Sequence, residues 1–294
     1  MGCGGDVGRR QLLQRTSTSS EPAKLSLPVE GTPLLRWAGS KKKLLPLLEE
    51  AAPANIRRYI EPFAGSAVLF LRLKPARAIL SDLNTDLIKT YETVRCDPVK
   101  VWRLVRQIPA GHDDYYRVRD IAPATLDPIS RAARFVYLNR YCFNGVYRTN
   151  REGQFNVARG KGCLGIPSRE LFEAFAQRLE AVDLRCSDFQ ATVRRASQGD
   201  FCYLDPPYAG TGTRDRGEYG PGSFKSLDLE RLAGAMEGAD KRGANVLLSY
   251  AEQPEVLTRF AGWHIKRLSV ARNVSGFSGT RRRASEVLIS NYRW

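Results

Sequence analysis

The chain has 294 residues, of which 43% are hydrophobic; this suffices for one large domain and excludes a disordered or collagen-like protein. Its 46 Lys and Arg residues outnumber 31 Asp and Glu residues, and the formal net charge of +15 favours an anionic partner, above all nucleic acid. The six cysteines contain no C-x-x-C pair and the two histidines lie far apart, which argues against a metal site and a disulfide framework. No apolar run approaches the roughly 20 residues that span a bilayer, so we expect no membrane segment, and the scattered cysteines suit the reducing cytoplasm.

The first elements along the chain predict strands that alternate with helices. Residues 1–31, rich in Gly, Ser, Thr and Gln, are predicted to be a flexible leader outside the fold. An apolar run at 58–63 predicts a strand, 67–73 a helix and 78–82 a second strand. Such alternation is typical of a parallel sheet whose faces are covered by helices.

The pattern changes between residues 85 and 169, where β-rich apolar runs give way to helical spacing, as in the run from Val101 to Ile108. We therefore predict an α/β fold in which 32–84 and 170–294 form one Rossmann-like domain. The stretch 85–169 is predicted to be a mostly helical insertion in that domain. Further strands are predicted at 200–205, 244–249, 265–270 and 286–291, the last two as a terminal hairpin.

A glycine turn and an acid form the first candidate site. Gly65 follows the first strand in the segment EPFAGS, where it lets a ligand approach the backbone closely. Asp82 ends the next strand seventeen residues later, where a carboxylate can accept hydrogen bonds from a ribose. The pair predicts a cofactor that contains adenosine, although an ordinary strand-end glycine and a helix-capping aspartate stay open. The glycines are too few for a dinucleotide fingerprint.

A second candidate site is the tetrad Asp205-Pro206-Pro207-Tyr208, which directly follows the apolar run FCYL. Two prolines stiffen the backbone and leave carbonyl oxygens as rigid acceptors. With a carboxylate on one side and a flat aromatic ring on the other, this set suits a planar group that carries an amine. The alternative is a strand that simply ends in a Pro-Pro turn.

The third candidate is the basic segment 131–161, which holds seven Arg or Lys residues interleaved with aromatic residues, against one acid, Glu152. Cations neutralise phosphates, and arginine can read guanine edges through two hydrogen bonds. A solvated basic face on a helical subdomain stays open, with Phe135 and Tyr137 as the first candidates for its core. Four asparagines add amides that can contact phosphate or base edges: Asn139, Asn144, Asn150 and Asn156.

Longer motifs connect these segments in order. They are LRWAGSK at 35–41, EPFAGS at 61–66, LSDLNTDLI at 80–88, LNRY at 138–141, EGQFNV at 152–157, DPPY at 205–208 and a basic tail at 281–289. In this order, over about residues 33–292, the chain resembles the Dam-like family of DNA adenine-N6 methyltransferases. The resemblance implies a Rossmann-like methyltransferase domain that depends on S-adenosylmethionine, with a helical insertion that recognises double-stranded DNA.

The resemblance also implies the reaction: methyl transfer to the N6 amine of adenine in a short specific site, without a metal. Because N6 is paired inside a duplex, the base would be flipped out of the helix. Asp205 and the Pro206 carbonyl would accept the hydrogens of the amine, Pro207 would stiffen the turn, and Tyr208 would stack on the base. Two alternatives stay open: a methyltransferase of the same fold acting on RNA or a protein amide, and a DNA-binding relative without activity.

Matched position by position, the family's motifs imply two sets of binding residues. The cofactor pocket would be lined by Trp37, Lys41, Phe63, Gly65, Ser66, Asp82, Asp188 and Asp205. The DNA would contact Arg36, Arg140, Asn144, Arg148, Asn150 and Asn156. Of these, Arg148 is expected to read a base. Ser40, Val146 and Ala158 depart from the family's pattern, so a target other than GATC stays open. We expect a monomer or a weak dimer, associated with the nucleoid through DNA.

Overall fold

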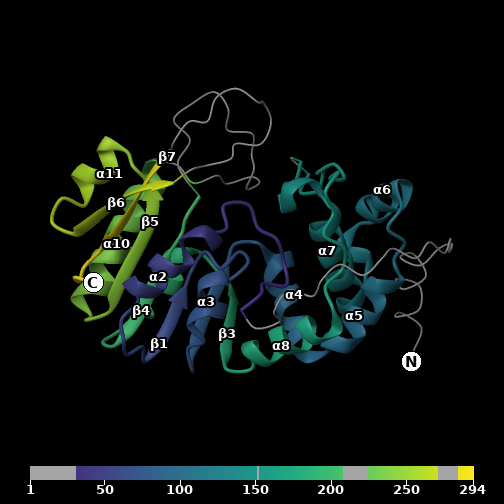
Figure 1. Cartoon of the computed structure of the whole chain (residues 1–294), viewed down its shortest axis with the longest axis horizontal. Helices are drawn as coiled ribbons and strands as arrows, with labels where there is room; N and C mark the ends of the chain where they lie inside the picture. The colour runs from purple at the N-terminus through teal and green to yellow at the C-terminus, as the bar shows by residue number, and fades with distance from the viewer. Residues whose placement is uncertain (1–30, 151, 208–223, 225, 271–283) are drawn as a thin grey trace.

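The computed structural model describes residues 31–150, 152–207, 224, 226–270 and 284–294, which form a mixed sheet flanked by helices (Figure 1). In this part of the chain the sheet has seven strands in the order β3-β2-β1-β4-β5-β7-β6. Their bounds are β1 (Arg58–Glu61), β2 (Ala78–Asp82), β3 (Val182–Cys186), β4 (Asp200–Leu204), β5 (Asn245–Ala251), β6 (His264–Val270) and β7 (Ala284–Ser290). Strands β3, β2, β1, β4 and β5 pair in parallel, whereas β7 is antiparallel to β5 and β6. The predicted α/β fold is confirmed.

The predicted strands are confirmed, with differences at their ends. The strand predicted at 58–63 ends at Glu61, because Pro62 has no N–H to donate to a ladder. The terminal hairpin is also confirmed, and its second strand, β7, pairs with β5 as well, which leaves β6 at the edge of the sheet. Residues 281–283 of the predicted basic tail lie outside the described residues.

Ten α-helices occur in the described residues, and several begin at side chains that cap them. The Asn84 side chain accepts a hydrogen bond from Leu87 N at 3.0 Å, and Asp127 caps the helix that begins with Pro128. Beside the sheet lie α2 (Leu45–Ala51), α3 (Val68–Leu73), α8 (Arg169–Leu179), α9 (Phe189–Val193), α10 (Ser226–Lys241) and α11 (Pro254–Arg259). Between β2 and α8 the chain forms α4 (Thr85–Cys96), α5 (Pro98–Gln107), α6 (His112–Asp120), α7 (Pro128–Tyr141) and the 3-10 turn η3 (Phe143–Gly145).

Alternate residues of each central strand enter two different cores, one on each face of the sheet. In β1, Tyr59 packs on the face covered by α2, α3 and α4, and Ile60 packs on the face covered by α9, α10 and α11. In β4, Phe201 joins Tyr59 and Cys202 joins Ile60. Because both faces are buried, the middle of each strand is apolar, as expected for parallel strands between two helical layers, and the charged residues Arg58, Glu61 and Asp200 stand at the strand ends.

Helices dominate the stretch between β2 and α8, as its spacing predicted, and Figure 1 shows α5, α6 and α7 on the side of the molecule away from β6 and β7. Phe135 and Tyr137 of α7 are buried there, which confirms them as core residues. They belong to the same continuous core as Tyr59 and Phe201 of the sheet. The stretch therefore shares one apolar core with the sheet and does not have a core of its own.

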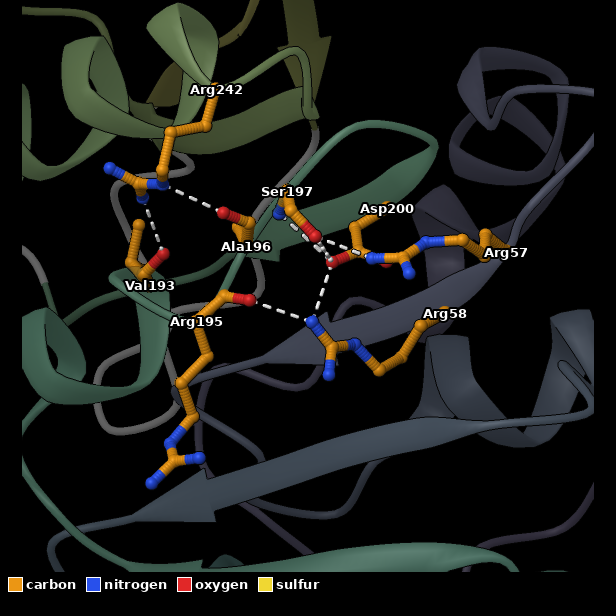
Figure 2. Close-up of polar contacts among 8 residues, drawn as sticks. All are labelled: Arg57, Arg58, Val193, Arg195, Ala196, Ser197, Asp200 and Arg242. Carbon is orange, nitrogen blue, oxygen red and sulfur yellow. Dashed lines mark hydrogen bonds and ion pairs between the residues drawn. The ribbon is translucent and has the colours of Figure 1, made fainter.

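A network of arginines closes the edge of the sheet where β1 and β4 begin (Figure 2). The carboxylate of Asp200 is fully buried and accepts hydrogen bonds from Arg57 Nε at 3.1 Å, Arg58 Nη2 at 2.7 Å and Ser197 N at 3.0 Å. Arg242 donates to Ala196 O in the loop before β4 at 2.7 Å and to Val193 O at the end of the preceding helix at 3.0 Å. The network ties the end of α10 and the start of β1 to β4, at the edge opposite Asp205.

None of the helices in the described ranges has both the length and the apolar character that crossing a membrane requires. The five cysteines that fall within these ranges, all except Cys3, are unpaired thiols.

Candidate active site

The candidate site lies where the strand order reverses. From β1 the chain continues to β2 and β3 on one side, whereas β4 and β5 lie on the other side. In open α/β sheets, ligands bind beyond the carboxyl ends of the strands at such a reversal. Glu61 ends β1 and Asp205 follows β4, so the structure brings the segment EPFAGS and the Asp-Pro-Pro-Tyr tetrad to the same edge.

The glycine turn is held against the acid of the next strand. Gly65 N donates to Asp82 Oδ2 at 3.1 Å, and Asn84 N donates to Asp82 Oδ1 at 2.9 Å. Gly65 has a φ of +45°, and a Cβ built there would lie 2.6 Å from Cδ1 of Trp37. Only glycine fits this position without displacing the indole. The turn and Asp82 thus lie together, as their sequence spacing predicted.

Asp205 is held through one of its two carboxylate oxygens. Lys41 Nζ lies 2.6 Å from Asp205 Oδ1, and Ser249 Oγ donates to the same oxygen at 2.8 Å. Among the described residues these are the side-chain hydrogen bonds of Asp205, and Oδ2 takes part in neither. Burial raises the pKa of the Asp205 carboxyl, and the Lys41 ammonium and the Ser249 hydroxyl oppose that rise.

The rest of the tetrad is described only in part. Pro206 is buried and Pro207 is half-buried at the end of β4. Tyr208 lies outside the described residues. At the neighbouring strand end, Glu61 is buried, and burial raises its pKa well above the usual range, with the charges of Asp205 and Asp82 adding to the effect.

Aromatic side chains cover the side of the turn nearest α9. The Phe63 ring stacks on Phe189 with a centroid distance of 5.4 Å and meets Phe224 edge-on at 6.3 Å. Asp188, predicted to contact the cofactor, caps α9 through Gln190 N at 2.9 Å and pairs with Arg231 at 2.9 Å. These two contacts hold the Asp188 carboxylate at the start of the helix.

The N-terminal motif connects the turn with the helical stretch. Trp37 lies against Gly65 and stacks on Tyr147, with ring centroids 6.1 Å apart and planes 14° apart. Ser66 Oγ lies 3.4 Å from Ser40 Oγ, so the motif also borders the buried start of α3. The structure therefore brings Trp37, Lys41 and Ser66 to one place.

The residues predicted to meet DNA lie on the helical stretch and on the motif docked to it. Arg36 is fixed by Asn139, whose side-chain amide accepts from Arg36 N at 2.8 Å and donates to Arg36 O at 2.7 Å. Arg148 Nε donates to Asn156 Oδ1 at 2.8 Å, which couples two of the predicted residues directly. The two residues occupy facing segments that an antiparallel bridge between Thr149 and Phe155 holds together.

Three others of this set have contacts of their own. The Asn150 side chain stabilises its own turn, because its Nδ2 donates to Gln154 Oε1 and its Oδ1 accepts from Gln154 N. Arg140 donates to Gly165 O at 2.9 Å, and burial lowers the pKa of its guanidinium to about 10. Asn144 is exposed with a left-handed φ of +53°. Asn150 thus stabilises the turn next to Arg148.

Two residues at the site were missed at the level of sequence, Ser249 and Tyr203. Asn139 was expected to contact phosphate or base edges, but it is buried and its side-chain amide is bound to the backbone of Arg36. Ser249 and Tyr203 are single polar residues inside apolar strands, and no spacing along the chain relates them to Asp205. Only the parallel pairing of β4 with β5 brings them together. Among the described residues no group of three or more His, Cys, Asp and Glu side chains is arranged to hold a metal ion.

Comparison with known proteins identifies the family. A family profile described as D12 class N6 adenine-specific DNA methyltransferase matches residues 37–274. The chain belongs to this family. It is therefore a DNA adenine methyltransferase, and the predicted family, fold and activity are confirmed. Methyltransferases of this family imply S-adenosylmethionine as the methyl donor and DNA as the substrate.

Individual relatives match most of this methyltransferase. The type II methyltransferase M1.LlaDCHI of Lactococcus lactis subsp. cremoris is 30% identical over 88% of this chain and 95% of its own length. The type II methyltransferase M.MjaIII of Methanocaldococcus jannaschii is 33% identical over 90% of this chain and 100% of its own. The DNA adenine methylase of Escherichia coli K12 is 32% identical over 86% of this chain and 93% of its own.

Proposed function

We propose that this methyltransferase flips its target adenine out of duplex DNA and binds the N6 amine to Asp205 and the Pro206 carbonyl. The observation that carries the proposal is that only one of the two Asp205 carboxylate oxygens is bound by described side chains. Lys41 and Ser249 both bind Oδ1, which leaves Oδ2 as the acceptor for one N–H of the amine. The second N–H would go to the carbonyl oxygen of Pro206, which the ring of Pro207 helps to hold in place.

The chemistry requires acceptors because N6 is a weak nucleophile whose lone pair is delocalised into the ring. Two hydrogen bonds from N6 to fixed acceptors favour a tetrahedral nitrogen and localise that lone pair. When bound, S-adenosylmethionine supplies a methyl group activated by a sulfonium, so positioning can carry much of the rate. Positive charge develops on N6 as the N–C bond forms and the C–S bond breaks, and the Asp205 carboxylate stabilises it. The proton that N6 then loses leaves along its hydrogen bond to Asp205.

The residues beside the glycine turn fit this cofactor in shape and charge. A Cβ at Gly65 would meet Trp37, so the turn is as close to the indole as a backbone can be. Asp82 binds the glycine turn and Asp205 pairs with the Lys41 ammonium, so two carboxylates lie at this edge of the sheet, which suits a cofactor with a sulfonium and an amino group. We assign the ribose to Asp82. Trp37, Lys41, Phe63, Gly65, Ser66 and Asp188 are the other proposed pocket residues.

For DNA we propose the surface that carries Arg36, Arg140, Asn144, Arg148, Asn150 and Asn156. Asn156 holds Arg148 through Nε, and the two terminal nitrogens of the guanidinium have no described hydrogen bond, so they can reach a base edge. In this assignment 85–169 is the target-recognition insertion, and 32–84 with 170–294 is the catalytic domain. Tyr208 is proposed to stack on the flipped base.

The names of the relatives indicate a biological role. Two of them are named type II methyltransferases, which is consistent with a partner in restriction and modification. We propose a protein that acts on cellular DNA as a monomer or weak dimer in the cytoplasm.

The proposed function is tested by methyl transfer from labelled S-adenosylmethionine to plasmid DNA, followed by digestion to nucleosides. We expect label in N6-methyladenosine of duplex DNA and none in RNA or protein offered in parallel. Label in N4-methylcytosine, or a preference for RNA or protein, would contradict the proposal. Sequencing modified bases in DNA from expressing cells then gives the target site.

Arg148→Ala is expected to relax discrimination at one base pair by about 1–3 kcal/mol, because it removes a side chain proposed to read a base edge. The measurement is kcat/KM on duplexes that carry the mapped target and each of its single-base-pair variants. Arg169→Ala is the matched control, because Arg169 is exposed on α8 and pairs with Glu173 at 2.9 Å. Unchanged discrimination in Arg148→Ala would remove Arg148 from the reading role.

A further inference from the structure

We propose that Tyr203 and Ser249 form a hydrogen-bonded chain that fixes the orientation of the Asp205 carboxylate, and that both act as positioning residues for methyl transfer. The inference rests on the proposed role of Asp205 as the acceptor of the target amine. It adds two residues outside every motif that the sequence analysis singled out.

The hydrogen-bonded chain passes from Tyr203 on β4 to Ser249 on β5 and returns to Asp205, which follows β4. Tyr203 lies on β4 and Ser249 on β5, and these strands are paired in parallel with Leu204 opposite Leu248. Continued by one residue, this register brings Asp205 level with Ser249. Tyr203 OH lies 3.1 Å from Ser249 Oγ, and Ser249 Oγ lies 2.8 Å from Asp205 Oδ1. The two hydroxyl groups and the Asp205 carboxylate thus form one continuous series of hydrogen bonds.

The direction of the protons along this path follows from the chemistry of the groups. An ionised carboxylate only accepts hydrogen bonds, so Ser249 must donate its single proton to Asp205. The Ser249 oxygen can then only accept from Tyr203, whose hydroxyl must be the donor. Each hydroxyl therefore has one allowed orientation while Asp205 is ionised. The path is an ordered chain that ends on Oδ1.

Burial indicates that the Ser249 hydroxyl serves this contact. Ser249 has an exposed fraction of 0% and Tyr203 of 2%, among apolar neighbours such as Leu247. A buried hydroxyl costs free energy unless it is hydrogen-bonded, and an alanine would fill the same place in β5 without that cost. The contacts that satisfy Ser249 are those to Tyr203 and Asp205.

Ser249 and Lys41 both bind Asp205 Oδ1, but they contribute differently. Lys41 supplies the counter-charge from a long side chain that also contacts Gly39 O at 3.2 Å. Ser249 supplies a short donor fixed to a buried strand, which sets the plane of the carboxylate and turns Oδ2 away from β5. The Ser249 hydrogen bond also lowers the pKa of Asp205, against the effect of burial. Without it, the carboxylate would protonate at a higher pH.

The test compares Ser249→Ala, Ser249→Thr and Tyr203→Phe in steady-state kinetics on the mapped target duplex. For Ser249→Ala we expect kcat to fall by about ten- to a hundred-fold, since a hydrogen bond to a charged group is lost. The KM values for DNA and cofactor should stay near those of the parent. The acid limb of the kcat–pH profile should move to higher pH. Ser249→Thr, which keeps the hydroxyl, should restore most of the rate, and Tyr203→Phe should lose less than Ser249→Ala.

Ser290→Ala is the matched control, because Ser290 is an equally buried strand serine that donates to Tyr292 O at 2.7 Å, away from Asp205. It should leave the acid limb in place. An unmoved acid limb together with an unchanged kcat in Ser249→Ala would overturn the inference, as would a loss of rate that Ser249→Thr does not restore. If Ser249→Ala does not fold, Tyr203→Phe decides by the same two readouts. Full activity of Asp205→Asn would instead refute the proposed role of Asp205, so the two failures are distinguishable.

Discussion

Replacing Asp205 with alanine is expected to abolish methyl transfer while DNA binding stays nearly intact. The carboxylate is the proposed acceptor of the target amine, and without it neither the lone pair nor the developing charge on N6 is stabilised. DNA affinity rests on the excess of Arg and Lys, which the substitution does not alter. Single-turnover methyl transfer and equilibrium binding to the same duplex, at one fixed salt concentration, measure the two properties.

Two further variants make the result specific to the carboxylate. Asp205→Asn keeps the shape of the side chain and an oxygen for Ser249, so its loss of activity isolates the charge. It removes the partner of the Lys41 ammonium, which is only 9% exposed, so melting must be monitored for both variants. Asp183→Ala is the control, because Asp183 forms an exposed ion pair with Arg185. A collapse of DNA binding equal to the loss of activity would contradict the separation of binding from chemistry.

Replacing Asp200 with alanine is expected to lower the free energy of unfolding by about 1–3 kcal/mol, because buried donors lose their acceptor while water can still solvate the partly exposed guanidinium groups. Asp200 is fully buried and holds Arg57 and Arg58 at the amino ends of β1 and β4 (Figure 2). Removing it leaves the half-buried Arg58 guanidinium without its carboxylate and the Ser197 amide without its acceptor. Urea unfolding followed by circular dichroism measures the change.

The same variant should keep its chemistry, because Asp200 and Asp205 lie at opposite ends of β4. We expect kcat per folded molecule to match the parent below the unfolding transition. Glu173→Ala, which breaks the exposed pair with Arg169, should cost no more than about 1 kcal/mol. A loss as small as this in Asp200→Ala would mean that the buried carboxylate does not stabilise the sheet.

Local residue chemistry made much of the fold predictable. Short apolar runs marked the strands, and Pro62 and Pro206 mark where two of them end, because proline cannot donate to a ladder. Gly65 was identifiable because it directly follows the first predicted strand, and the structure adds the reason that no side chain fits there, its contact with Trp37. Asp82 followed from its place at the end of the next strand. These features depend on neighbours within a few residues or on one strand-helix-strand unit.

Other features depend on groups that only folding brings together. Asn139 binds the backbone of Arg36 across 103 positions of sequence, and Lys41 meets Asp205 across 164. Ser249 meets Asp205 only because β5 pairs with β4 in one register, and a shift by one residue would turn its hydroxyl to the opposite face. The residue types that methyl transfer needs can therefore be read along the chain. The orientation of the Asp205 carboxylate, the proposed acceptor of the target amine, is decided by strand pairing, because a hydrogen bond forms only between atoms about 3 Å apart.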